Sequence, residues 1–131
     1  MENDNKYSAL CSDCAEHFFD MSENNYVRPA QIPVARDRLL VITNNGKPLV
    51  NEKWVIVKRD DHILIYDRQS GYCIYDAKLL MLETNESEND LVAVVSEIRI
   101  NQDTSQRPKE LTEDDFCIVS DLITGKCREE E

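Results

Sequence analysis

The stretch Trp54-Val-Ile-Val-Lys-Arg-Asp-Asp-His-Ile-Leu-Ile-Tyr-Asp67 decides the fold. Two runs rich in β-branched and aromatic residues flank Asp60-Asp61, which predicts two strands joined by a two-residue hairpin turn. In that register one face carries Val55, Val57, Leu64 and Tyr66, and the other carries Trp54, Ile56, Ile63 and Ile65. Because both faces are apolar, we expect the hairpin to be central in a sheet that is covered on both sides.

Similar short runs occur on either side of this hairpin, at residues 38–43, 72–76, 79–83, 91–100 and 116–121. Each is rich in Val, Ile, Leu or Tyr and ends near turn residues, which predicts strands. A segment with Pro29 and Pro33 precedes them and is interpreted as a connection. The expected fold is α+β, a mainly antiparallel β-sheet or a small barrel or sandwich of about six to eight short strands.

An amphipathic helix is expected before the strands. From residue 7 to about residue 21 the apolar positions follow helical spacing, at Tyr7, Leu10, Cys11, Cys14, Phe18 and Met21. Such a stripe is typical of a helix that packs one face on a core. The prediction is therefore an N-terminal amphipathic helix that covers one face of the sheet.

This helix raises the question of a metal site, because Cys11, Cys14 and His17 are three possible zinc ligands. A fourth ligand could come from His62, Cys73, Cys117 or Cys127, yet no second short ligand motif is present. The helical stripe explains both cysteines as small buried apolar residues, so we expect no metal and no other cofactor. A dithiol redox site is disfavoured, since no strand can precede Cys11. A zinc-binding regulatory or accessory subunit remains the alternative.

All three glycines directly follow predicted strands, which indicates tight turns. Two of these turns share the pattern Asp-x-x-Ser/Thr-Gly-x-Cys, at residues 67–73 and 121–127. The chain is too short for a repeat architecture. We interpret the pattern as the same hairpin loop used twice.

The length of 131 residues fits a single domain, 1–131. Residues 1–6 and 128–131 are expected to be flexible, and 84–90 and 101–112 are expected to be exposed loops. No stretch is apolar enough for a membrane span, and the N-terminus lacks the pattern of a signal peptide. We therefore expect a cytoplasmic protein whose five cysteines stay reduced.

Charge is unevenly distributed along the chain, whose formal net charge is −11. Residues 1–27 hold six acids and one base, 28–82 hold six acids and nine bases, and 83–131 hold fourteen acids and five bases. This field repels nucleic acids and anionic membranes, so we expect neither as a direct partner. It favours a basic protein partner, with Glu86, Glu88, Asp90, Glu113, Asp114 and Asp115 as the expected binding residues.

Catalytic signatures are missing from the sequence: it has two histidines, no nucleophile elbow, no phosphate-binding loop and no dinucleotide fingerprint. We therefore expect that it is not an enzyme. The function expected is a small acidic binding protein that inhibits or neutralises a basic partner, as immunity proteins, antitoxins and phage-type inhibitors do. The alternatives are a structural component of a larger assembly and, less in keeping with the charge, stacking of single-stranded nucleic acid on Trp54, Tyr66, Tyr72 and Tyr75.

Overall fold

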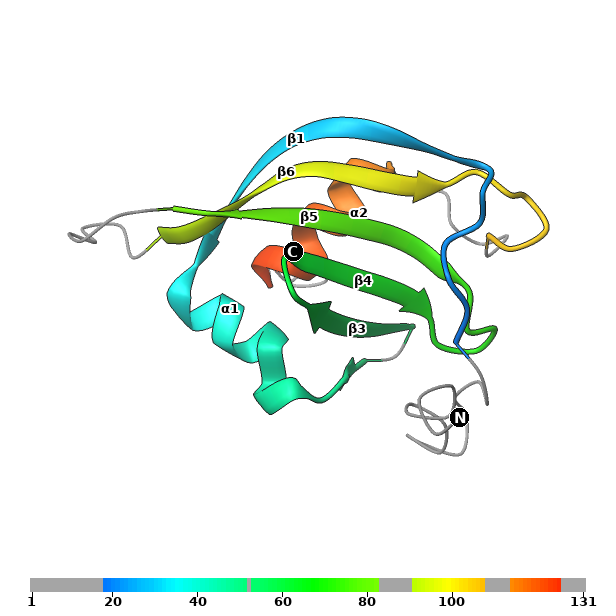
Figure 1. Cartoon of the computed structure of the whole chain (residues 1–131). Helices are drawn as coiled ribbons and strands as arrows, with labels where there is room; N and C mark the ends of the chain where they lie inside the picture. The colour runs from blue at the N-terminus through cyan, green and yellow to red at the C-terminus, as the bar shows by residue number, and fades with distance from the viewer. Residues whose placement is uncertain (1–17, 52, 83–90, 108–113, 126–131) are drawn as a thin grey trace.

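The structure, a computed structural model, describes residues 18–51, 53–82, 91–107 and 114–125. The described residues form one six-stranded antiparallel sheet with two helices on one side of it (Figure 1). The strands are β1 (Asn25–Ala35), β2 (Leu49–Val50), β3 (Trp54–Arg59), β4 (His62–Asp67), β5 (Cys73–Met81) and β6 (Leu91–Asn101). The helices are α1 (Arg36–Thr43) and α2 (Asp115–Thr124), and a short 3₁₀ turn, η1 (Asn44–Gly46), follows α1.

The strand order is β1-β6-β5-β4-β3-β2. From β1 at one edge, α1 carries the chain to the opposite edge, and β2 to β6 then return as an antiparallel meander (Figure 1). The sheet curves over α2. The expected antiparallel sheet is confirmed: within the described residues it is a single sheet with β1 and β2 as its edge strands, rather than a sandwich or a closed barrel.

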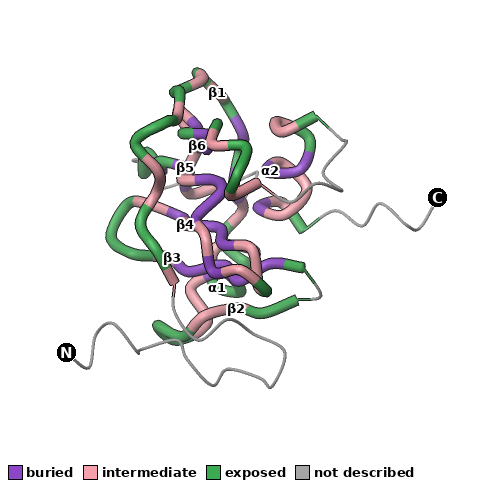
Figure 2. Tube along the Cα trace, turned by 90° about the vertical axis from the view of Figure 1, so that its right-hand side faces the viewer, coloured by how far each residue is buried: buried purple, intermediate pink, exposed green. Residues whose placement is uncertain are grey.

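The hairpin of β3 and β4 has the predicted register, with Arg59 opposite His62 and a tight turn in which Asp60 has a φ of 56°. On the inner face, which bears the helices, its buried residues are Trp54, Ile56, Ile63 and Ile65. On the outer face a separate cluster contains Val55, Val57 and Tyr66, with Leu64 partly buried. The buried residues concentrate along the strands and on α2 (Figure 2). Both faces of the hairpin are therefore covered, as predicted.

Residues 18–24, called the strap below, cover the outer face at the β3–β4 hairpin. The Phe18 ring meets Tyr66 edge-on at 5.2 Å, and Phe19 lies 5.1 Å from Tyr72. The Phe19 N–H donates to the Gly71 carbonyl at 2.9 Å. Residues 18–21 are thus not helical, and the prediction of a helix that reaches residue 21 is wrong for them. Both phenylalanine rings contact aromatic residues of the sheet region, and the Phe19 N–H bonds to a distant carbonyl instead of one within a helix. Residues 7–17 of that predicted helix lie outside the described residues.

Residues 38–43 form most of α1, so the prediction of a strand is wrong. The helix places Ile42 in the inner core, while Leu40 remains 64% exposed and Val41 46% exposed. Asn44 ends it in the left-handed conformation, with a φ of 50°. A short apolar run is compatible with the periodicity of a strand or of a helix. Here the chain crosses from one edge of the sheet to the other, and a helix buries part of the apolar inner face.

Residues 116–121 lie in α2, a second run wrongly predicted as a strand. Asp114 caps the helix, since its carboxylate accepts from the Cys117 N–H at 3.2 Å. Gly125 ends the helix with a φ of 78°. Ile118, Val119 and Ile123 are its buried residues. The Asp-x-x-Thr-Gly pattern is therefore a helix end here, whereas at residues 67–71 it joins β4 to β5, and the interpretation as two hairpin loops is wrong for the second copy.

The segment with Pro29 and Pro33 is a strand, β1, and not a connection. Among the strands that the structure describes, it pairs only with β6 and so lies at the edge, where proline is tolerated. Residues 72–76 and 79–83, predicted as two strands, mostly merge into β5. Asn101, expected in an exposed loop, is buried and donates from Nδ2 to the Cys73 carbonyl at 2.9 Å.

Candidate partner-binding surface

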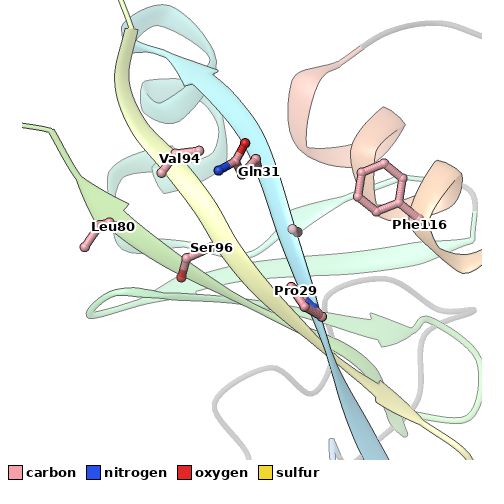
Figure 3. Close-up of a pocket in the computed structure, with 7 residues that line it drawn as sticks. Pro29, Gln31, Leu80, Val94, Ser96 and Phe116 are labelled. Atoms are coloured by element: carbon pink, nitrogen blue, oxygen red, sulfur yellow. The ribbon is translucent and has the colours of Figure 1, made fainter.

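An open groove of about 700 Å³ lies at the β1 side of the sheet, and its lining residues extend across three neighbouring strands to β5 (Figure 3). Its lining comes from β1, from the outer face of β5 and β6, and from α2. The principal lining residues are Pro29, Gln31, Leu80, Val94, Ser96 and Phe116. The groove thus joins segments that are far apart in the sequence, with apolar side chains around two polar ones.

Irregular strand pairing accounts for the place of the groove. Pro29 pairs with Glu97 and Ile32 pairs with Val95, so two residues of β1 stand opposite Ser96 alone. The pairing of β6 with β5 also shifts beside Ser96. Bulges bend a strand and increase its twist. Two of them at one position bend the sheet where the groove is formed.

An exposed apolar stretch lies at the end of the β5–β6 hairpin next to this groove. Leu80, Met81 and Leu82 are 57%, 55% and 40% exposed. The Leu82 N–H still donates to the Val92 carbonyl at 2.9 Å, so the strands remain paired there. Successive residues of a strand point to opposite faces, so Leu80 lies on the outer face, where it lines the groove, and Met81 lies on the opposite face. Exposed apolar area is therefore present on both sides of this hairpin.

The wall of the groove at α2 is stabilised by one cation. The Arg28 guanidinium carbon lies 4.9 Å from the centre of the Phe116 ring, and Arg28 Nη1 lies 3.9 Å from the Asp114 carboxylate. The side chain of Asp114 is 58% exposed. Arg28 therefore fixes the phenylalanine ring and partly neutralises Asp114.

Asp115, the neighbour of Asp114, points into the protein. It accepts hydrogen bonds from the Tyr75 hydroxyl at 2.6 Å and from Arg107 at 2.9 Å, and its side chain is only 19% exposed. Burial, followed by this hydrogen bond, raises the pKa of Tyr75 above its usual range. Of the expected binding acids, Asp115 is thus engaged internally and Asp114 is at the surface.

The other expected binding acids, Glu86, Glu88, Asp90 and Glu113, lie outside the described residues. Their positions in the chain are nevertheless informative, because residues 83–90 connect Leu82 with Leu91, and Glu113 precedes Asp114. Leu80 and Phe116 both line the groove. Leu80 is three residues before Glu83, and Phe116 is two residues after Asp114. In the sequence, both acidic stretches are therefore close to residues that line the groove.

A second opening, of about 410 Å³, lies between the strap and the outer face. Cys73 lies at this opening, and burial, reinforced by the charge of Asp76, raises the pKa of its thiol to about 12. Asp76 itself lies 2.7 Å from His62 Nδ1. A thiol with such a pKa stays protonated at neutral pH, which lowers its reactivity as a nucleophile.

Cys11, Cys14 and His17 also lie outside the described residues. Within the part of the chain that is described, no three His, Cys, Asp or Glu side chains gather as metal ligands would. Of the aromatic residues considered for base stacking, Trp54, Tyr66 and Tyr75 are buried and only Tyr72 is partly exposed. This arrangement removes most of the stacking surface.

The groove has no counterpart among the sequence-based predictions, because these interpret the segment with Pro29 and Pro33 as a connection. One signal was present: Ile32 and Val34 alternate with polar or proline residues, which is the period of a half-buried strand. No helix in the described ranges has the length and apolarity needed to cross a bilayer. No protein-family model, curated protein or solved structure matches this chain.

Proposed function

We propose that this protein is a small acidic binding protein that inhibits or neutralises a basic protein partner. The observation that supports this function best is an apolar groove whose lining residues are close in the sequence to two acidic stretches. Leu80, Met81 and Leu82 are exposed, the groove continues from Leu80, and residues 83–90 carry four acids without a base. An apolar centre with a polar rim is the usual anatomy of a protein interface.

The two features have different physical roles in this proposal. Acidic side chains at the rim speed the encounter with a basic partner, because complementary charge steers association. The apolar side chains slow dissociation, because burying them removes apolar area from water at about 25 cal/mol per Å². We place the protein in the cytoplasm, where its five cysteines remain thiols. Immunity proteins, antitoxins and phage-type inhibitors represent this class.

Affinity capture from source cells tests the proposal. The full-length baits are the wild type, the variant Glu86→Gln, Glu88→Gln, Asp90→Asn, and the variant Glu129→Gln, Glu130→Gln, Glu131→Gln. The two variants lose the same amount of charge, so only position distinguishes them. We expect wild type and the C-terminal variant to retain a basic protein that the first variant retains poorly.

Two results contradict the proposal: the retained protein is acidic or neutral, or both variants weaken capture equally. In the second case total charge, rather than the stretch beside the hairpin, controls binding. Purified partner and baits should then be compared by association rate, which rim charges affect most.

A further inference from the structure

We propose that the groove along β1 receives an amphipathic helix from a basic partner, with apolar side chains of that helix packed on Leu80, Val94 and Phe116. This inference rests on the proposed function, because it assigns a partner structure to the same surface. Helices bind grooves through side chains at positions i, i+3, i+4 and i+7. A groove of about 700 Å³ accommodates several such side chains.

As an edge strand of the described sheet, β1 is unsuited to the other common mode, addition of a strand from the partner. Strand addition needs a row of main-chain donors and acceptors along the edge. Pro29 and Pro33 have no N–H to donate. The bulge between Pro29 and Ile32 further interrupts the regular spacing. The partner must therefore be held by side-chain packing in this part of the edge.

Charge indicates that the helix is basic. Arg28, the cation at the α2 wall, is engaged by Asp114 and by the Phe116 ring. The chain as a whole has a net charge of −11, and the stretch from residue 83 onward contributes fourteen acids against five bases. Lysine and arginine on the flanks of a bound helix would meet this negative field, whereas an acidic helix would be repelled.

Synthetic peptides test the inference on the full-length protein. The probe is a labelled helix of about four turns with leucine at i, i+3, i+4 and i+7 and lysine elsewhere. One control peptide has the same composition in scrambled order, and another replaces lysine with glutamate. Binding is followed by fluorescence anisotropy for wild type and for the variants Leu80→Ser with Val94→Ser, and Leu40→Ser. Leu40 is an exposed leucine that does not line the groove.

We expect the leucine–lysine helix to bind wild type about tenfold more tightly than either control peptide, and the groove variant to lose about tenfold while Leu40→Ser loses nothing. Equal binding of the helical and scrambled peptides, or indifference to the groove variant, would overturn the helix inference. Neither result affects the proposed function, which fails separately if capture yields no basic partner. Circular dichroism of the groove variant confirms that its fold is intact.

Discussion

At the scale of single residues, Cys73 shows how the strap alters chemistry. The thiol is 1% exposed in the cluster that Phe18 and Met21 help to cover. Burial is the largest cause of its raised pKa, and the charge of Asp76 adds to it. The strap therefore protects a group that would be reactive if it were exposed.

The raised pKa predicts a loss of stability in alkali. In the unfolded chain Cys73 ionises near its ordinary pKa of 9.0, and in the folded protein only near 12. The thiol therefore contributes stability that is fully present below pH 9 and is lost as the pH rises toward 12. The free energy of unfolding, measured with denaturant at several pH values, should fall as the pH rises above 9. Cys73→Ala should make this fall less steep by up to about 1.4 kcal/mol per pH unit. Cys117→Ala, at an exposed position, is the control, and equal slopes for wild type and Cys73→Ala would mean that the thiol is solvated.

At the scale of elements, one short pattern forms the same turn in two settings. The Gly71 N–H donates to the Asp67 carbonyl at 2.8 Å, and the Gly125 N–H donates to the Asp121 carbonyl at 2.9 Å. Both glycines have a positive φ, 84° and 78°. The local turn is thus encoded by the pattern, while the segments around it determine whether it joins two strands or ends a helix.

The end of α2 predicts a difference between two glycine substitutions. Arg38 donates to the Ile123 and Leu122 carbonyls at 2.9 and 2.8 Å, and a Cβ at Gly125 would lie 2.9 Å from its guanidinium carbon. Gly46 has a similar φ of 82° but no atom within 4 Å of such a Cβ. We expect Gly125→Ala to lower the free energy of unfolding by about 1–3 kcal/mol more than Gly46→Ala, because it displaces a charged donor.

A double-mutant cycle identifies the cause of that difference. In an Arg38→Ala background the extra cost of Gly125→Ala should disappear, since the guanidinium is absent. Additive effects of the two substitutions would show that the backbone conformation alone is responsible.

The central hairpin predicts a large effect at Ile65. Its side chain is 0% exposed in the inner core and lies between Ile56 of β3 and Tyr75 of β5. Ile65→Ala should lower the free energy of unfolding by about 2–5 kcal/mol, and Ile65→Val by about 0.5–1.5 kcal/mol, as measured with denaturant. An alanine effect below about 1 kcal/mol would be incompatible with a close-packed position between two strands.

At the scale of the whole molecule, the charge distribution predicts a salt-dependent encounter with the partner. Neutralising Glu86, Glu88 and Asp90 together should lower the association rate at low salt while leaving dissociation almost unchanged. The Debye length falls from about 30 Å at 0.01 M to about 10 Å at 0.1 M salt, so the difference from wild type should narrow over that range. Stopped-flow association at both salt concentrations measures this. A rate that is indifferent to salt and to the substitutions would leave the acids with a role in solubility only.

The sequence by itself determined the β3–β4 hairpin, because two six-residue runs rich in β-branched and aromatic residues on either side of a two-residue turn are a local signal. It also determined where three positive-φ glycines stand, since no other residue adopts that conformation as easily. The acidic segments were equally evident. For the candidate partner-binding surface, the sequence therefore predicted the acidic charge but not the apolar groove.

Only the tertiary structure decided the rest. Residues 38–43 and 116–121 are short apolar runs that fit a strand or a helix, and they became helices where the inner face of the sheet needed cover. Pro29 and Pro33 argue against a strand locally, yet β1 tolerates them because it lies at the edge. The groove depends on contacts between β1, β5, β6 and α2, whose residues are up to 87 positions apart, from Pro29 to Phe116. Such long-range packing leaves no local pattern in the sequence.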